Sequence, residues 1–225
     1  MSHKTAAIIV AGGTGSRMGA DVPKQFLPLC GKEIITYTIE TFASCDFIDK
    51  IIIVCHADYL EHCKELFGSV ENVSYITGGA TRQESVSRGL TLAQDTDYVL
   101  VHDAVRCLVS EDEIHTLYRT LTGKGSCTLA VRVKDTVKSA DDNNIVTSTI
   151  PRDNLWQIQT PQAFVTKELT VAHSYAAKTG FIGTDDCSVM EHMQKPIILV
   201  EGRYENIKIT TPSDIEIAKV FLKGR

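Results

Sequence analysis

The sequence predicts an α/β protein with a mostly parallel sheet and helices on both of its faces. Through the first half of the chain, short apolar runs of strand length alternate with segments of helical periodicity. These runs also lack the polar–apolar alternation of a sheet with one face in water. Such continuous apolar strands are typical of a parallel sheet that is buried on both sides.

Four strand–helix units account for this first half. Ile35, Ile39 and Phe42 share one face and predict the first helix, and Val86 and Leu90 do the same for the third. The second helix is predicted to end at a glycine. The expected strands are 6–13, 50–56, 72–79 and 98–104, and the expected helices are 33–44, 57–68, 84–93 and 111–121.

The pattern changes at about residue 127. Residues 127–139 and 143–164 look extended, and the polar turn 139–144 between them predicts a hairpin. This hairpin is either a plain antiparallel edge or an arm that reaches a second subunit. Helix and strand alternate again from Thr166 to the last helix, and no repeat or linker interrupts the chain. A single domain over residues 1–225 is therefore expected.

Composition limits the possible partners and location. The chain has 225 residues, of which 43% are hydrophobic and 23% charged, and its formal net charge is −5. These values predict a soluble globular protein and argue against nucleic acid as a partner. The seven cysteines contain no CxxC pair, so we expect reduced thiols and no zinc site. The apolar run near the N-terminus is too short for a signal peptide or a membrane span, which favours the cytoplasm.

The first strand runs into the segment VAGGTGSRMGADVPKQF, residues 10–26. It fails the dinucleotide pattern GxGxxG because Met18 stands at the third glycine, and it lacks the GK[ST] ending of a P-loop. Backbone N–H groups in a glycine turn can still approach an anion closely. Arg17 and Lys24 would add cationic donors for phosphate. The segment thus favours phosphate binding, with a plain turn and two solvated cations as the alternative.

Other strand ends add polar groups to the same edge of the sheet. Because ligands bind at the carboxyl ends of strands in open sheets, the loops after the first, third and fourth strands should meet there. Asp103 follows the fourth strand, and one carboxylate beside phosphates suits Mg²⁺. Gly78, Gly79 and Ser85 follow the third strand and offer bare backbone for reading a base. Lys208 begins a later extended segment.

Seven motifs along nearly the whole chain carry a family resemblance. They are AGGTGSRMGADVPKQF, GGATRQESV, VHDAVR, VKDTVK, PRDNLWQIQTPQAF, GTDDCSVME and NIKITTPSD, in this order. Each is weak alone, but the ordered set resembles the 2-C-methyl-D-erythritol 4-phosphate cytidylyltransferases. The resemblance implies a Rossmann-like nucleotidyltransferase fold, CTP as co-substrate, Mg²⁺, and transfer of CMP to a polyol phosphate in isoprenoid biosynthesis. It also implies a homodimer whose exchanged arm, about residues 131–158, completes the neighbouring site.

The resemblance further implies a role for each matching residue. Arg106 and Thr136 would be lent across the dimer, and Asp103 would hold the metal. The implied catalytic residues are Arg17, Lys24 and Lys208. The implied CTP-binding residues are Ala11, Gly12, Gly13, Gly15, Gly79, Ala80 and Ser85. The implied residues for the second substrate are Asp103, Arg106, Thr136 and Arg152.

Two other functions fit parts of the sequence. The first is ribitol-5-phosphate cytidylyltransferase, which the glycine segment resembles at least as much. The second is a non-catalytic nucleotide-binding protein on the same fold. Cys107 stands where relatives usually have proline, which predicts a less constrained loop beside Arg106. A loop cysteine is the simpler interpretation of Cys107, and a reactive thiol is the alternative.

Overall fold

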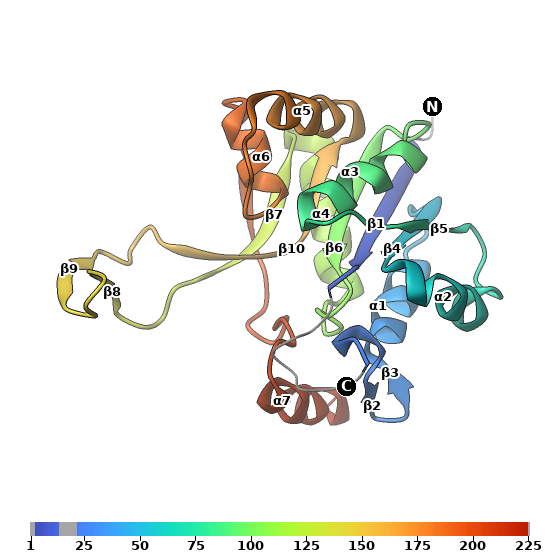
Figure 1. Ribbon diagram of the computed structural model, residues 1–225, viewed down its shortest axis with the longest axis horizontal. Coiled ribbons are helices and arrows are strands. Elements are labelled where there is room, and N and C mark those ends of the chain that lie inside the picture. The colour runs from blue at the N-terminus through green and yellow to red at the C-terminus, as the bar shows by residue number, and fades with distance from the viewer. Residues whose placement is uncertain (1–2, 14–21, 225) are drawn as a thin grey trace.

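A computed structural model of the chain describes residues 3–13 and 22–224, with one seven-stranded sheet at its centre (Figure 1). The strands lie in the order β11-β7-β10-β6-β1-β4-β5. All neighbours are parallel except β10, which is antiparallel to both β6 and β7. The sheet is therefore mostly parallel, as predicted. Its strands are β1 (Thr5–Ala11), β4 (Lys50–Cys55), β5 (Val73–Thr77), β6 (Tyr98–Asp103), β7 (Cys127–Arg132), β10 (Trp156–Val165) and β11 (Ile198–Glu201).

Helices cover both faces of this sheet. Successive side chains of a strand point to opposite faces, so Ile9 and Ile53 pack in one core cluster and Ile8 and Ile52 in the other. The first cluster takes in α1 (Ile34–Ala43), α2 (Leu60–Phe67) and α4 (Glu111–Lys124). The second takes in α3 (Arg82–Leu92), α5 (Thr166–Thr179) and α6 (Asp186–His192).

The predicted strands and helices of the first half are confirmed with small differences at their ends. Residues 57–68 split into a 3₁₀ turn, η3 (Ala57–Tyr59), followed by α2. Helix α3 begins two residues earlier than predicted because Thr81 caps it, its side chain accepting a hydrogen bond from the Glu84 amide. The early start places Arg82 in the first turn of the helix, at the carboxyl edge of the sheet.

The extended region around residue 140 forms a separate hairpin, as predicted. Its strands are β8 (Val137–Ala140) and β9 (Val146–Ile150), which pair antiparallel outside the main sheet. Figure 1 shows this hairpin far from the body of the protein, on the long segments that follow β7 and precede β10. The projecting arm is shorter than the predicted 131–158, because Arg132 and Trp156 still pair with each other in the main sheet.

A small third cluster of apolar residues lies beyond the carboxyl ends of the parallel strands. It joins the C-terminal helix α7 (Pro212–Lys223) to residues beside the hairpin β2 (Pro28–Leu29) and β3 (Lys32–Glu33). Cys107 is 1% exposed in this cluster, so it packs as a core residue rather than standing in an open loop. Within residues 3–13 and 22–224, no helix has the length and apolar character needed to cross a bilayer.

Candidate functional site

A cavity of about 350 Å³ lies at the carboxyl ends of the parallel strands. The loop after β1, the turn after β5 and the end of β6 all line it, so the predicted meeting of these loops is confirmed. Lys208 joins them from a segment that precedes α7. The lining residues are Val10, Ala11, Gly12, Gly13, Lys24, Gln25, Gly79, Ala80, Thr81, Arg82, Ser85, Asp103, Val105 and Lys208.

The 3₁₀ turn η2 (Lys24–Phe26) places Lys24 on the wall of this cavity. Its neighbour Gln25 is buried and donates hydrogen bonds to the carbonyl oxygens of Ala11, at 2.5 Å, and Gly13, at 3.2 Å. These bonds tie the turn to the end of β1. The backbone of residues 11–13 and the side of the turn that carries Lys24 therefore line the same cavity. Gln25 was missed in the sequence, because a glutamine in a PKQF segment does not reveal its partners. The predicted Gly15 and Arg17 lie outside the described residues.

The turn after β5 is shaped by close contact with the start of α3. The Gly79 amide donates to the Ser85 hydroxyl at 3.1 Å, and the Ala80 amide donates to the Glu84 carboxylate at 2.8 Å. A Cβ atom at Gly79 would lie 2.3 Å from Cβ of Glu84, so only glycine fits there. Both amides already have partners within the turn. These contacts fix the conformation of the turn, of which Gly79 and Ala80 line the cavity.

Asp103, at the end of β6, is surrounded by three cations. Its Oδ1 lies 3.2 Å from Nε of Arg82, and its Oδ2 lies 2.8 Å from Nζ of Lys208 and 3.9 Å from Nε of Arg106. Burial alone would raise the pKa of Asp103, but Arg82, Lys208 and Arg106 outweigh it and hold that pKa well below its usual range. The group is thus a carboxylate at neutral pH, and the wall around it carries excess positive charge suited to an anion.

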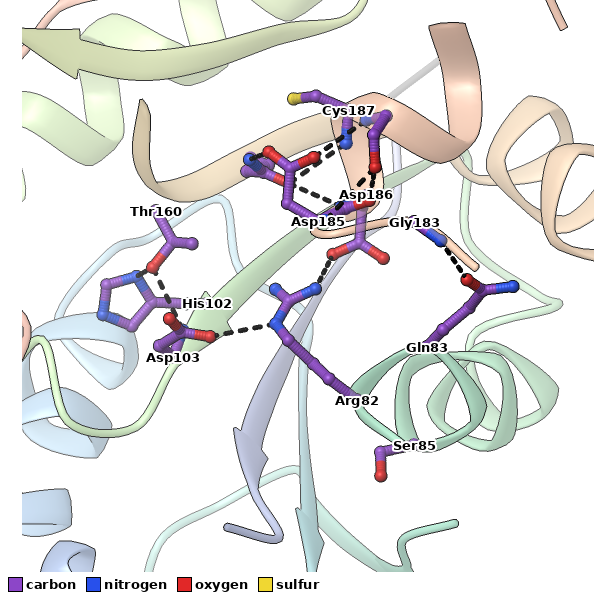
Figure 2. A network of polar contacts seen from close by, with 12 residues as sticks. Arg82, Gln83, Ser85, His102, Asp103, Thr160, Gly183, Asp185, Asp186 and Cys187 are labelled. Carbon is purple, nitrogen blue, oxygen red and sulfur yellow. Dashed lines mark hydrogen bonds and ion pairs between the residues drawn. The ribbon is translucent and has the colours of Figure 1, made fainter. Parts of the chain in front are cut away.

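Arg82 is the principal residue that sequence reasoning missed. It lines the large cavity and also a second one of about 150 Å³, which contains Arg106, Thr160 and Asp185. Figure 2 shows its guanidinium between two carboxylates: Nη1 lies 2.7 Å from Oδ2 of Asp186, while Nε faces Asp103. The available signal was a cation two residues after the glycine–alanine turn, at an edge already expected to bind anions.

His102 is fully buried next to Asp103, and its hydrogen bonds connect the segments that form this part of the site. The Thr160 hydroxyl accepts a hydrogen bond from the Asp103 amide at 3.1 Å and lies 3.0 Å from Nδ1 of His102, as Figure 2 shows. The Arg106 carbonyl, 3.3 Å from Nε2, can only accept a hydrogen bond, so Nε2 of the neutral ring is the donor. Nδ1 is then an acceptor, and the Thr160 hydroxyl donates to it. The neutral ring joins β6, β10 and the Arg106 loop.

The buried ring predicts a pH dependence of stability. Burial lowers the pKa of His102 to about 3, below the value of 6.5 for an exposed histidine. Between these values the unfolded chain binds a proton that the folded protein does not, so stability falls as the pH drops below 6.5. From pH 7 to pH 5 this group alone should remove about 2 kcal/mol. Urea unfolding at both pH values checks this loss, with His102→Gln as the comparison. An equal pH slope in the variant would contradict the assignment.

Not all the predicted substrate residues come together in one chain. Thr136 and Arg152 are exposed on the arm, where Arg152 donates a hydrogen bond to the Lys134 carbonyl, and neither lines the cavities. Arg106 instead lines the second cavity of its own chain, and its Nη1 donates to the Asn206 carbonyl at 2.8 Å. The lending of Arg106 across a dimer stays a prediction.

The donor set around Asp103 fits a metal ion only together with a substrate. Among residues 3–13 and 22–224, no group of three or more His, Cys, Asp or Glu side chains could hold an ion. Mg²⁺ commonly uses one or two carboxylates, with waters and substrate phosphates completing its shell. Asp103 is one ionised carboxylate beside a cavity large enough for phosphates, so it fits that mode. Its Oδ2 now contacts Lys208, which phosphate groups would have to attract away before that oxygen could bind the ion.

Comparisons with known proteins agree with this geometry. The family model of 2-C-methyl-D-erythritol 4-phosphate cytidylyltransferase matches residues 5–224. A protein of that name from Desulforamulus reducens is 42% identical over 97% of this chain and 96% of its own. The crystal structure of 4-diphosphocytidyl-2C-methyl-D-erythritol synthase from Anaerococcus prevotii is similar at a TM-score of 0.88 and 33% identity, over 99% of this chain and 97% of that one. The crystal structure of 2-C-methyl-D-erythritol 4-phosphate cytidylyltransferase from Francisella tularensis is similar at a TM-score of 0.85 and 34% identity. This match covers 97% of this chain and 99% of that one. The chain belongs to the 2-C-methyl-D-erythritol 4-phosphate cytidylyltransferase family.

Proposed function

We propose that the protein transfers CMP from CTP to 2-C-methyl-D-erythritol 4-phosphate, releasing pyrophosphate, as a step of isoprenoid biosynthesis. One observation carries the proposal beyond family membership. The large cavity, with its glycine-rich wall, and the smaller cavity, with Arg106, share Arg82, Asp103 and Lys208. Two phosphorylated substrates, one in each cavity, would bring their reacting phosphates together at this shared wall, beside Asp103 and Lys208.

The chemistry requires positioning and charge neutralisation. A phosphate oxygen of methylerythritol phosphate attacks the α-phosphorus of CTP, and pyrophosphate leaves in line with it. The nucleophile is already an anion, so no general base is needed. The main cost is the approach of two polyanions, and Lys24, Lys208 and the predicted Arg17 would stabilise the added negative charge in the transition state.

Asp103 would hold Mg²⁺ in this reaction, and the bound ion would offset phosphate charge as a Lewis acid. As the phosphates arrive, Lys208 can leave the Asp103 carboxylate, 2.8 Å away, and donate to a phosphate oxygen instead. Its side chain is 39% exposed and therefore has room to move. The predicted nucleotide contacts, at Ala11, Gly12, Gly13, Gly79, Ala80 and Ser85, line the large cavity, consistent with CTP there.

A pyrophosphate-release assay with two acceptors tests the proposed substrate. The purified protein is given CTP and Mg²⁺ with either 2-C-methyl-D-erythritol 4-phosphate or ribitol 5-phosphate. We expect release with the first acceptor and at most slow release with the second. Release with ribitol 5-phosphate alone would establish the alternative polyol, and CTP binding without release would favour a non-catalytic nucleotide-binding protein.

We also propose that residues 1–225 act as one domain in a homodimer with exchanged arms. The long distance between the arm and the body in Figure 1 supports this, since Thr136 and Arg152 would otherwise have no substrate to contact. The arm also exposes apolar side chains: Ile145 is 62% and Val146 is 57% exposed. A second subunit would cover them.

Mixed dimers test the exchange. Lys24→Ala and Arg152→Ala chains are each expected to be nearly inactive. If arms are exchanged, a heterodimer has one site that carries both substitutions and one site that carries neither. Mixing the two variants after mild unfolding should therefore restore activity, with each heterodimer reaching up to about half the activity of a wild-type dimer. If each arm serves its own chain, every site keeps one defect. A mixture as inactive as its components, with heterodimers verified by mass spectrometry, would contradict exchange.

A further inference from the structure

Arg82, on the shared wall of the two cavities, forms an ion pair with Asp186, which is buried behind that wall. Asp186 is 1% exposed and lines neither cavity. One of its oxygens contacts Nη1 of Arg82 at 2.7 Å, and the other lies 3.1 Å from Nε2 of the buried His173. Its amide donates to the Gln162 side chain at 3.0 Å, which fixes the start of α6 beside β10. The carboxylate is thus held from α3 and α5, and the backbone of the same residue is held from β10.

Such an arrangement is costly to build. Moving a carboxylate and a guanidinium out of water costs several kcal/mol per ion, and an apolar pair of similar volume is often at least as stable. Burial would raise the pKa of Asp186, yet Arg82 and His173 hold it below its usual value, so the pair stays charged. Stability alone therefore does not explain these charges. Their geometry relates them to the site, because the same guanidinium contacts Asp103.

Because the guanidinium of Arg82 is planar and rigid, its contact with Asp186 also fixes the orientation in which it meets Asp103. Nη1 contacts Asp186 and Nε contacts Asp103, so the two acids lie on different edges of one rigid group (Figure 2). A lysine ammonium is a single point charge on a flexible stem and cannot fix two acids in this way. With Oδ1 held by Arg82, Oδ2 of Asp103 is left facing Lys208 at the boundary of the two cavities.

We propose that Arg82 and Asp186 are positioning residues, which together hold the Asp103 carboxylate in the orientation that the transfer reaction uses. The inference rests on the proposed function. Arg82 acts through Asp103, and Asp186 acts through Arg82. Loss of either should therefore lower turnover, while CTP binding, which depends on the glycine-rich wall, should be affected little.

Four variants test this inference: Arg82→Lys, Asp186→Asn, the double variant Arg82→Gln/Asp186→Asn, and the matched control Gln83→Ala. Gln83 bonds to the Phe181 carbonyl and the Gly183 amide, so the control loosens the same contact between α3 and the segment before α6 without touching a charge (Figure 2). For each protein we would measure kcat, KM for both substrates, the affinity for CTP by calorimetry without acceptor, and the unfolding midpoint in urea.

We expect kcat to fall about 10–100-fold in Arg82→Lys and Asp186→Asn, as for other residues that orient a reacting ligand, with the calorimetric affinity for CTP unchanged within about threefold. The double variant removes both charges, so its unfolding midpoint should recover relative to Asp186→Asn while its kcat stays low. Gln83→Ala should lose stability and keep its kcat.

Two results would overturn the inference alone. One is a kcat in Arg82→Lys and Asp186→Asn that equals that of Gln83→Ala. The other is a double variant whose kcat recovers together with its stability, since the pair would then serve only the fold. A wild-type protein that binds CTP but releases no pyrophosphate would contradict the proposed function and the inference with it.

Discussion

Replacing Lys24 with alanine is expected to lower kcat by about 10²–10³-fold, the typical cost of removing one preorganised electrostatic group. Lys24 lines the large cavity on a turn that Gln25 anchors to the end of β1. Its charge would lie beside the triphosphate at the moment when negative charge increases there. Steady-state kinetics of pyrophosphate release checks this result. The fold should remain intact, because Gln25 keeps the hydrogen bonds that tie the turn to Ala11 and Gly13.

Lys195→Ala is the matched control for this variant. Lys195 pairs with Glu168 at 3.3 Å and lies on the wall of a different cavity. Its loss should leave kcat within about twofold, since an exposed ion pair contributes less than about 1 kcal/mol. Turnover of Lys24→Ala equal to that of Lys195→Ala would remove Lys24 from the catalytic group.

Asp103→Asn is expected to abolish most activity and also to weaken the fold. The amide would leave Arg82, Lys208 and Arg106 facing one another around a neutral side chain, and removing one partner of a buried ion pair costs about 3–5 kcal/mol. Turnover should fall by about 10²–10³-fold or more, because the proposed metal ligand and the partner of Lys208 are lost together. Kinetics at 20 °C, with the folded fraction measured by urea unfolding, separates the two effects.

The control for this second prediction is Asp49→Asn. Asp49 accepts a hydrogen bond from the Thr5 amide at 2.8 Å, near the start of β1 and thus at the opposite edge of the sheet. Its loss should reduce stability by about 1 kcal/mol and leave the turnover of folded protein unchanged. If folded Asp103→Asn turned over as fast as folded Asp49→Asn, the position of Asp103 at the reaction centre would be contradicted.

Much of this fold follows from local pattern. The apolar runs of β1, β4 and β6 could be identified because strands buried on both faces leave a continuous signal. The ends of the four predicted helices agree with the structure to within three residues. The carboxyl-edge rule then brought Lys24, Ser85 and Asp103 to one place without any knowledge of the tertiary contacts. The place of Lys208 at the reacting phosphates followed only from the family resemblance.

The positioning residues could not be found in the same way. Arg82 and Asp186 lie 104 positions apart, and their pairing depends on how α3 and α6 pack on the same face of the sheet. Gln25 likewise gains its role only when η2 folds back to β1. The bounds of the arm were too wide for a related reason: strand-like residues such as Arg132 and Trp156 look the same whether they pair in the main sheet or project from it.

Oxygen-isotope tracing tests the central claim most directly. The wild-type protein is incubated with CTP, Mg²⁺ and methylerythritol phosphate whose non-bridging phosphate oxygens are ¹⁸O, and both products are analysed by mass spectrometry. Attack by the acceptor phosphate on the α-phosphorus predicts that all ¹⁸O remains in the cytidine diphosphate product and that pyrophosphate is unlabelled. Labelled pyrophosphate, or the absence of any cytidine diphosphate product, would contradict the proposed reaction.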